Sequence, residues 1–562
     1  MHTLLPILAM LALVAGSGLL ARALPRIPLP LLQIAIGALA GWPPGGLHVT
    51  FHPQIFMLLF IPPMLFADGW QMPQREFGAY KWPILLSSTL LVLFTVGALG
   101  WLIHVLLPGL PTAEAFLLAA VLSPTDAVAV SAILQRHPVP TKLRHLIEGE
   151  ALMNDAAALV AVKFAVAAVL TRSFSLPQAL ADFVWVACGG VAVGIGFAWC
   201  FKLLHDRLLF WREERAAAPT VLLLLLVPFA PYLIAEHLGL SGVLAAVTAG
   251  MTTSAFDARS SRFNAFHLQT QNVWNVILFA FNGLIFTLVG LQLPQLVQHL
   301  PLPHPDLPTA AHMGFALFST ALLIALGVLA VRFVGLAGGG WLARGFGKRR
   351  TAGGRAELPL LAWSGIATLG GTRGGITLAA VLGVPLLMPD GSAFPARGLL
   401  VFQATMVIVL SLLIASFGLP RLLRRLALRT GNPHAREAAW ARDRAARAAL
   451  RTLESPDAAP HDATPPDPMR ALVRARIDHS YRHRLRPHHG KHPGDPDHPG
   501  ESAAQVQQAL ALERQLRLDA LQAERDELHR LRLAHRINDE TLRALIHEVD
   551  LVEMVIRSRP GG

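Results

Sequence analysis

Charged residues are scarce in this chain of 562 residues: Asp, Glu, Lys and Arg make up 15% of it, whereas hydrophobic residues make up 53%. Soluble domains contain about 25% charged residues, so the composition indicates a polytopic membrane protein. The first 430 residues contain 27 Lys and Arg against 16 Asp and Glu, and the rest contain 21 against 20. The basic excess belongs to the membrane part, where it is typical of cytoplasmic loops, and no motif for nucleic-acid binding accompanies it.

Other absences narrow the possible functions. The two cysteines, Cys188 and Cys200, lie in one apolar stretch and offer neither a disulfide framework nor the spacing of a metal site. No basic region precedes the first apolar run, residues 4–20, so this run is predicted to be a membrane helix and not a cleaved signal peptide. The apolar stretches contain no metal-binding motif or activated nucleophile, so we expect no cofactor and no membrane-embedded enzyme.

Apolar stretches of membrane-spanning length recur about thirteen times, and a bilayer core about 30 Å thick needs about 20 such residues per helix. They lie near residues 3–22, 29–45, 54–72, 82–107, 112–135, 146–170, 177–203, 217–237, 240–255, 270–296, 312–343, 358–387 and 396–419. The sequence therefore predicts an all-α membrane domain over residues 1–425 with about thirteen transmembrane helices. The division of residues 217–255 into two spans depends on the turn-like residues 237–242.

The loops between these stretches differ in charge. In one alternate set the only Lys or Arg residues are Arg172 and Arg397, and the other set contains the remaining basic loop residues. Because cytoplasmic loops carry an excess of Lys and Arg, we predict that the N-terminus lies outside and the C-terminal tail inside a bacterial-type inner membrane.

Two of the stretches are interrupted. The motif Ser-Pro-Thr-Asp breaks the fifth at residues 123–126, and Gly-Gly-Thr-Arg-Gly-Gly breaks the twelfth at residues 370–375. Proline removes a backbone donor and glycine loosens a helix, so both breaks leave backbone groups that need partners. The two stretches run in opposite directions under the predicted topology, which favours an inverted-repeat transporter over two unrelated kinks.

The residues after 425 differ in character from the membrane domain. We predict a basic helix and a disordered linker rich in Pro and His over residues 426–500, followed by an amphipathic helical tail over residues 501–562. Apolar residues recur at helical spacing in this tail, with a helix restart at Asn538 or Asp539. A helical hairpin, a coiled-coil dimer and a solvated amphipathic tail are all compatible with the pattern.

Carboxylates open the sixth apolar stretch, where they are costly in hydrocarbon and so indicate a functional site. With a rise of about 1.5 Å per residue, Asp155 lies on the order of 12 Å deep, and Asp126 of the broken fifth stretch lies at a similar depth. Thr125, Asp126, Asn154 and Asp155 are therefore candidates for one oxygen-rich site for a small hard cation, to which the unwound backbone would add carbonyls.

A buried aspartate can bind a cation or a proton, but hardly both at once, because desolvation favours the protonated form and a bound cation favours the ionised form. Competition at one site that opens alternately to the two sides is sufficient for antiport. The sequence thus favours a secondary antiporter for a monovalent cation and H⁺. The alternative from another class is a cation channel, or a channel-like sensor with a signalling tail.

Other ionisable residues are expected to be structural or to tune the site. Glu150 lies roughly opposite Asp155 on the helical wheel and needs a buried cation, for which we choose Arg332. Arg373, at the second break, could stabilise helix C-terminal carbonyls or repel a misplaced cation. Lys163 could tune Asp155 or extend into a polar cavity.

Asp68 adds a further candidate. It follows the Pro-Pro pair at residues 62–63 of the third apolar stretch, and we expect it to line the path of the ion.

Taken in order, several motifs resemble those of the monovalent cation:proton antiporters of the NhaP and eukaryotic sodium/proton exchanger type, over about residues 5–420. The motif Ser-Pro-Thr-Asp-Ala-Val at 123–128 looks like the family's unwound fifth helix, and residues 150–155 like its Glu-x-x-x-Asn-Asp ion site. The stretch 232–250, which includes Ala235-Glu236 and the Ser-Gly-Val-Leu motif at 241–244, resembles the helices that follow, and Arg-Gly-Gly at 373–375 resembles the family's Arg-Gly-Ala segment.

The resemblance implies specific roles. It implies that Asp155 is the carrier carboxylate, that Thr125, Asp126 and Asn154 bind or orient the ion, and that Glu150 forms a salt bridge with Arg332. It also implies a homodimer formed through the membrane domain and a function in pH and cation homeostasis with Na⁺, K⁺ or Li⁺ as the cation. Exchange would be electroneutral, because Asn154 stands where electrogenic relatives have a second aspartate.

This chain departs from the family pattern at two positions. Ala151 replaces the usual serine after the glutamate, which removes a possible hydroxyl ligand, and the acidic position of the third stretch is Ala67-Asp68. The preferred cation is therefore open on the sequence.

Overall fold

The computed structural model describes residues 4–24, 27–42, 53–72, 74–126, 141–172, 176–208, 222–223, 225–257, 264–298, 307–346, 359–426, 433–454, 474–475, 477–478, 481, 503–534 and 536–558. The chain divides into two compact units. The first, the membrane unit, comprises Met1–Met72, Phe77–Ser254 and Val273–Thr430, and the second, the tail unit, comprises Pro73–Glu76, Ala255–Asn272 and Gly431–Gly562.

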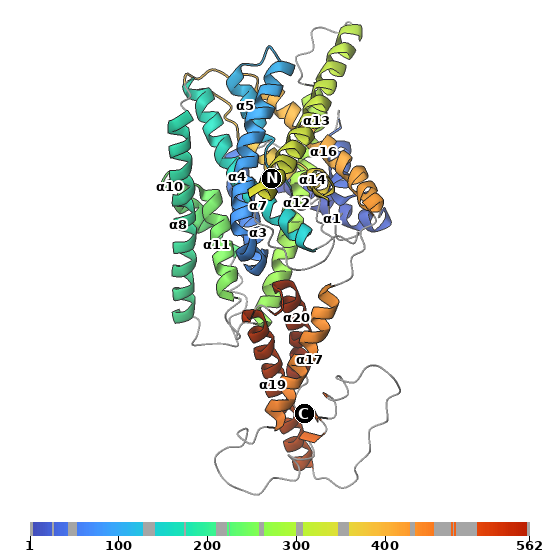
Figure 1. Cartoon of the computed structure of the whole chain (residues 1–562). Coiled ribbons are helices and arrows are strands. Elements are labelled where there is room, and N and C mark those ends of the chain that lie inside the picture. The colour runs from blue at the N-terminus through green and yellow to red at the C-terminus, as the bar shows by residue number, and fades with distance from the viewer. Residues whose placement is uncertain are drawn as a thin grey trace. The chain divides into compact units, whose positions relative to one another are not determined.

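Helices account for nearly all the regular structure of the described residues, together with one isolated bridge between Leu387 and Ala393 (Figure 1). In chain order up to residue 426 they are α1 (Leu4–Ala23), α2 (Leu29–Ala40), α3 (Pro53–Gln71), α4 (Gln74–Leu106), α5 (Thr112–Val121), α7 (Thr141–Thr171), α8 (Leu176–Leu208), α10 (Phe229–His237), α11 (Gly242–Asp257), α12 (Asn264–Gln298), α13 (Leu307–Phe346), α14 (Leu360–Leu369), α15 (Gly375–Leu382) and α16 (Arg397–Leu426). This order confirms the all-α membrane architecture.

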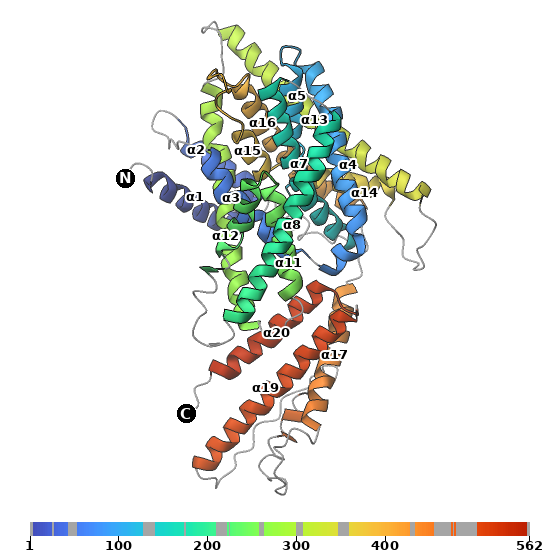
Figure 2. The same ribbon diagram turned by 90° about the vertical axis from the view of Figure 1, so that its left-hand side faces the viewer.

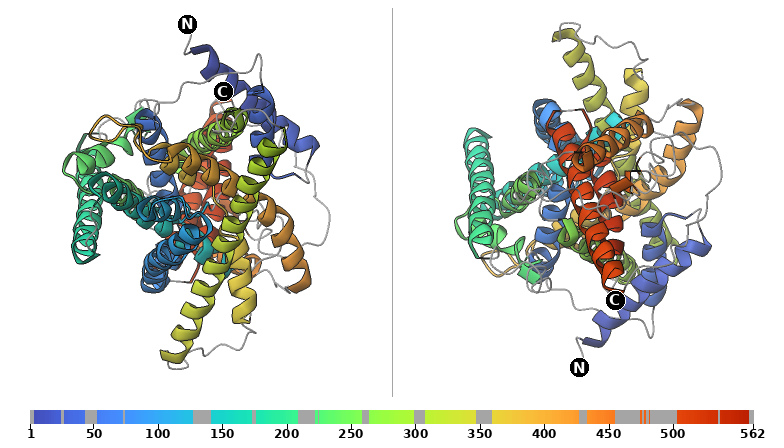
Figure 3. Two further views of the ribbon diagram at one scale, coloured as in Figure 1. Left: turned by 90° about the horizontal axis from the view of Figure 1, so that it is seen from above. Right: turned by 90° about the horizontal axis from the view of Figure 1, so that it is seen from below.

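Seven of the described helices are long and apolar enough to cross a membrane on their own. Each predicted stretch contains at least one described helix, but parts of the stretches at 112–135 and 217–237 lie outside the described residues. The count of thirteen crossings therefore stays a prediction. Burial separates central from peripheral helices: 61% of the apolar window is buried in α7 and α16, but 17% in α1 and α8. Accordingly, α1 and α8 lie at the edge of the bundle (Figure 3), and apolar side chains of α8 such as Trp185 are exposed, as expected for a helix that faces lipid.

Both predicted interruptions are confirmed. Helix α5 ends at Val121 and the chain from residue 123 to 126 is not helical, while α14 ends at Leu369 and α15 begins at Gly375. The two breaks satisfy each other's backbone: the N–H of Asp126 donates to the carbonyl of Thr372 at 2.7 Å, and the Thr372 hydroxyl donates to the Asp126 carbonyl at 3.1 Å. The second half of the fifth stretch, residues 127–140, lies outside the described residues.

Hydrogen bonds hold together the helices around the breaks, α5, α7, α13, α14, α15 and α16, which we call the site group. The N–H of Thr125, just after α5, donates to Asp155 of α7. Glu150 of α7 pairs with Arg332 of α13, which also donates to the carbonyl of Ala367 in α14. Helix α16 packs against α14, α15 and α5, and buried side chains of α5, α7, α13, α15 and α16 share one hydrophobic core.

Close backbone contacts and aromatic packing hold together a second set, α2, α3, α8, α10, α11 and α12, which we call the frame group. A Cβ at Gly37 of α2 would lie 2.1 Å from the carbonyl oxygen of Thr287 in α12, and one at Gly250 of α11 would lie 2.2 Å from that of Phe66 in α3. Glycine therefore lets these helices approach closely. A backbone hydrogen bond of 3.1 Å joins α8 to the residue before α11, and α10 leads into α11 through a short turn.

The tail unit contains α17 (Pro433–Glu454), α19 (Ala503–Leu533) and α20 (Asp539–Ser558), which pack together along their lengths (Figure 2). Helix α20 begins at one of the two predicted restart positions, and Asn538 caps it by accepting the N–H of Thr541 at 2.6 Å. Arg525 of α19 bonds to Asp550 at 2.7 Å and Glu553 at 2.6 Å on α20. Of the three arrangements compatible with the sequence, the structure shows the helical hairpin, with α17 added to it.

Most of the linker predicted to be disordered lies outside the described residues. Within it, Ile477 and Tyr481 are buried against α17 and α19, so this part of the linker belongs to the packed unit. No sequence pattern indicated this contact, because two apolar side chains in a polar stretch form no periodic repeat.

Candidate cation site where two broken segments cross

Asp155 lies on α7 with its carboxylate against the first break. Its Oδ1 accepts the backbone N–H of Thr125 at 2.9 Å, and both residues are buried. That donor is available because the helix has ended at Val121, so Thr125 has no helical carbonyl to bond. The first break thus positions the Asp155 carboxylate, which the sequence analysis identified as the candidate carrier. Its second oxygen, Oδ2, can bind a further ligand.

Asn154 fixes the side of α7 that faces the break. Its Nδ2 donates to the carbonyl of Ser123 and to the hydroxyl of Thr125, each at 3.1 Å. Its Oδ1 is buried and has no hydrogen-bond partner among the residues that the structure describes. A buried carbonyl oxygen without a donor is unfavourable unless something else binds it, and a small hard cation is suited to that role.

Asp126 faces the second break. The N–H of Gly375, at the start of α15, lies 3.4 Å from its Oδ2. Gly374 makes this approach possible, because a Cβ there would lie 1.7 Å from the same oxygen. The N-terminus of a helix carries a partial positive charge, so α15 stabilises the Asp126 carboxylate. Asp126 is therefore held by α15, whereas Asp155 is held by the first break.

Asp68 approaches the site from the frame group. It lies on α3, half-buried, beyond the buried Pro62 and Pro63. The negative charges of Asp126 and Glu148 lie close enough to interact electrostatically with the Asp68 carboxylate. Asp155 in turn lies within the fields of Asp68 and Asp126, so several acids share one region of low dielectric. Such a concentration of negative charge attracts cations and opposes full ionisation of all the acids together.

Arg373 supplies fixed positive charge to the same region. It is 1% exposed, and its Nε donates to the carbonyl of Leu122 at 2.8 Å, at the end of α5. A second nitrogen donates to the carbonyl of Gly371, after α14, and the Arg373 N–H donates to Ser411 of α16 at 3.0 Å. The arginine therefore binds the free carbonyls of two helix ends, one of the two roles considered from sequence, and its charge also acts on Asp155.

Glu150 faces away from this site and pairs with Arg332, the partner chosen from the sequence. The Nη2 of Arg332 lies 2.7 Å from Oε1 of Glu150, and the two side chains are 2% and 6% exposed. The Nε of Arg332 donates to the carbonyl of Ala367 at 3.2 Å. The pair joins α7, α13 and α14, and its charges act on Arg373. One turn before Asp155, Ala151 is buried at 3% exposure and offers no side-chain oxygen.

Lys163 is placed differently from both alternatives considered from the sequence. Its Nζ lies 2.6 Å from Oε1 of Glu236 on α10, and it neither contacts Asp155 nor extends alone into a cavity. The sequence assigned no role to Glu236 beyond its place in a resembling motif. A single carboxylate in an apolar stretch was the available signal, because such a residue calls for a partner. No comparable signal marked Ser411, since serine is common in membrane helices.

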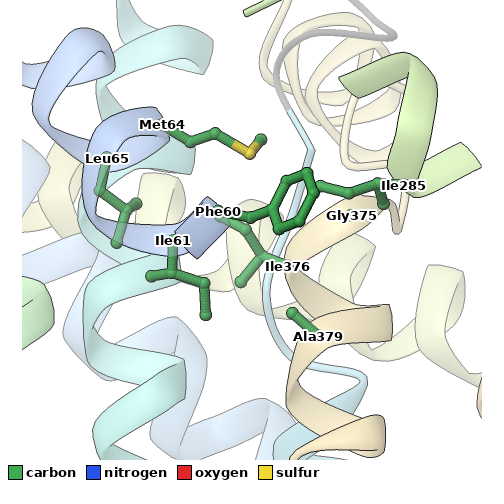
Figure 4. Close-up of a pocket in the computed structure, with 8 residues that line it drawn as sticks. All are labelled: Phe60, Ile61, Met64, Leu65, Ile285, Gly375, Ile376 and Ala379. Atoms are coloured by element: carbon green, nitrogen blue, oxygen red, sulfur yellow. The ribbon is translucent and has the colours of Figure 1, made fainter. Parts of the chain in front are cut away.

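Next to the site lies a small apolar pocket between α3, α12 and α15 (Figure 4). It is lined by Phe60, Ile61, Met64, Leu65, Ile285, Gly375, Ile376 and Ala379. Gly375 is shared with the ion site, where its N–H faces Asp126. The polar site therefore borders directly on apolar packing between the site group and the frame group.

Comparison with known proteins identifies the family. Residues 9–425 match the family described as "Sodium/hydrogen exchanger, transmembrane". The chain is 40% identical over 565 residues to the uncharacterized Na(+)/H(+) exchanger YjcE of Escherichia coli (strain K12), with 99% of each chain covered. It is 38% identical over 424 residues to the sodium, potassium, lithium and rubidium/H(+) antiporter of Bacillus pumilus, covering 75% of this chain and 61% of that one.

A solved structure supports the architecture. The sodium proton antiporter MjNhaP1 from Methanocaldococcus jannaschii at pH 8 matches 76% of this chain and 99% of its own, with a TM-score of 0.56 and 18% identity. At this identity the likeness concerns the fold alone. With the family match over nearly the whole membrane unit, the chain belongs to the sodium/hydrogen exchanger family and is a multi-pass secondary transporter, not an enzyme.

Proposed function

We propose that this protein exchanges Na⁺ for H⁺ by competition at Asp155. The observation that carries the proposal is the buried Asp155 carboxylate, which accepts the Thr125 N–H at the helix break, beside an Asn154 oxygen that lacks a hydrogen-bond partner among the described residues. Carboxylate, amide and hydroxyl oxygens are the ligands that hard cations prefer. Thr125 and Asn154 would complete the ion's shell with Asp155, and Asp126 would contribute charge or a direct oxygen.

Competition follows from the low dielectric around the carboxylate. A proton neutralises Asp155 in a buried site, and a cation does the same by ion pairing, so either ligand satisfies the group but both together do not. The negative charges of Asp68 and Asp126 favour whichever cation is present. Exchange then requires only that the site opens in turn to each side of the membrane with Asp155 neutralised.

The same geometry supports electroneutral exchange. Asn154 donates two hydrogen bonds through Nδ2, which hold its side chain against the break. Its amide carries no charge, so Asp155 is the one ionisable residue of this pair. One carrier carboxylate then exchanges one cation for one proton. Arg373 remains fixed on carbonyl oxygens through the cycle and transports no charge.

Cation choice is proposed to extend beyond Na⁺. The Bacillus pumilus relative is named for sodium, potassium, lithium and rubidium, and its match covers 75% of this chain. Ala151 has no side-chain oxygen that could act as an extra ligand and restrict the choice of cation, which is consistent with transport of K⁺ and Li⁺ as well.

The setting of the exchanger completes the proposal. The charge of the loops supports an inner-membrane protein with its N-terminus outside and its tail in the cytoplasm, serving pH and cation homeostasis. We assign residues 1–425 to exchange, residues 426–500 to a helix and linker, and residues 501–562 to the helical tail. We also propose a homodimer formed through the membrane unit, which cross-linking in native membranes would test.

The experiment that tests the function is cation-induced proton movement. Purified protein in proteoliposomes with an entrapped pH dye receives Na⁺, K⁺ or Li⁺ while a gradient of the permeant anion thiocyanate sets the potential. The proposal predicts proton movement with Na⁺ that is insensitive to the imposed voltage. A channel would instead carry cation current with no proton coupling, and exchange that follows the voltage would refute electroneutrality.

A further inference from the structure

The ion pair between Lys163 and Glu236 crosses between the two groups of helices. Lys163 lies on α7 of the site group and Glu236 on α10 of the frame group, with Nζ and Oε1 2.6 Å apart. The Glu150–Arg332 pair, by contrast, lies inside the site group. Because α7 also carries Asp155, a contact that holds this helix against the frame acts on the position of the proposed carrier.

Glu236 has a second bond that ties it to the next helix. Its Oε1 also accepts the N–H of Gly242, the first residue of α11, at 3.2 Å. Helix N-termini leave free donors, so this carboxylate caps α11 while it pairs with α7. A Cβ at Gly242 would lie 2.9 Å from Oε1 of Glu236 and 2.8 Å from the ring of Tyr232, so glycine is needed for the approach. Glu236 therefore holds its position even without Lys163.

Two other contacts between the groups, among the residues that the structure describes, are apolar. The pocket between α3, α12 and α15 is lined by apolar side chains (Figure 4), and Phe164 of α7 packs on Phe183 of α8 with ring centroids 6.5 Å apart. Apolar contacts are non-directional, so they let packed helices slide with little cost. An ion pair is directional and either forms or breaks. The Lys163–Glu236 bond thus has the geometry of a two-position contact.

We propose that Lys163 and Glu236 form a latch that positions α7 against α10 and α11 in one of the two states of the exchange cycle. This inference rests on the proposed exchange at Asp155. The side chains are 48% and 32% exposed, so the pair is weak enough to break in every cycle. A buried pair such as Glu150–Arg332 would resist such breakage far more strongly.

The positions of Lys163 and Glu236 along their helices indicate on which side of the membrane the latch lies. Lys163 lies about two turns beyond Asp155 towards the C-terminal end of α7, which is Thr171, and Glu236 is the penultimate residue of α10. Under the proposed orientation both ends face outwards. The latch therefore keeps the outer side closed, and breaking it favours the state that opens outwards.

The test compares the half-saturating Na⁺ concentration from each side of the membrane, in right-side-out and inside-out proteoliposomes. Lys163→Gln and Glu236→Gln each remove the charge pair, and the amide oxygen introduced by Glu236→Gln can still accept the Gly242 N–H. When one state gains population, apparent affinity rises on the side to which it opens and falls on the other. We expect each variant to lower the concentration needed outside and raise it inside, by about two- to five-fold.

Controls separate the latch from a structural role. Lys163→Arg keeps the pair and should match wild type, and the double variant should shift no further than either single variant. Misfolded protein lowers the maximal rate but leaves both concentrations unchanged. Shifts in the same direction on both sides, no shift, or additive shifts in the double variant would each overturn the latch. If wild type moves no protons when Na⁺ is added, the proposed exchange itself fails, which is a different result.

Discussion

Replacing Glu150 by Gln removes the charge that compensates Arg332 in the centre of the site group. The two side chains are 6% and 2% exposed and their atoms lie 2.7 Å apart, so solvent screens the pair very little. Removing one partner of a buried pair costs about 3–5 kcal/mol, because the other charge is left unpaired. Arg332→Gln should cost about 1 kcal/mol more than Glu150→Gln, since Ala367 also loses its donor.

The assay is unfolding of the purified protein in mixed detergent micelles, followed by loss of helical circular dichroism. In the double variant two neutral amides replace the two charges, so neither charge is left unpaired. The double-mutant cycle should therefore give a coupling free energy of about 2–3 kcal/mol between Glu150 and Arg332. The Lys163→Gln and Glu236→Gln cycle is the matched control: its side chains are 48% and 32% exposed, so its coupling should be about 0.5 kcal/mol. Strictly additive losses for Glu150 and Arg332 would refute the argument.

Two further predictions concern the breaks and the tail. Gly374→Ala places a Cβ against Oδ2 of Asp126 and should lower exchange on the order of 100-fold, whereas Gly365→Ala, where the nearest atom is 3.4 Å away, should leave it near wild type. His529 is held below its ordinary pKa of 6.5 by burial and by Arg532, and its Nε2 has no partner among the described residues. A lowered pKa means that the stability contributed by neutral His529 is complete above 6.5 and is lost as the pH falls below it. The protection factors of the tail amides, which are corrected for the intrinsic exchange rate at each pH, should therefore fall at acidic pH, and His529→Gln should weaken that dependence.

The features predictable from sequence were those with a local cause. Proline and clustered glycine marked the breaks at residues 123–126 and 370–375, because each changes the backbone at its own position. Burial cost marked Asp155 and required a cation for Glu150, and few candidates existed within the apolar stretches. These inferences needed no knowledge of which helices are neighbours.

Features that depend on neighbouring helices were not predictable. From the sequence, Lys163 is expected to tune Asp155, which lies two turns away on the same helix, or to extend into a polar cavity. Its partner in the structure, Glu236, comes from α10. The hydrogen bond between the two breaks, from Asp126 to Thr372, likewise joins residues 246 apart. Helical periodicity states which face is apolar but not what covers it.

The central claim is that Na⁺ and H⁺ compete for the Asp155 carboxylate, and the most direct test is the pH dependence of the half-saturating Na⁺ concentration in proteoliposomes. Competition predicts that this concentration rises by up to about ten-fold for each unit of pH lowered in the acidic range, at an unchanged maximal rate, because each proton bound removes one cation site. Asp155→Glu should retain exchange with a shifted profile and Asp155→Asn should lose it. A half-saturating concentration independent of pH, or exchange retained in Asp155→Asn, would contradict the account.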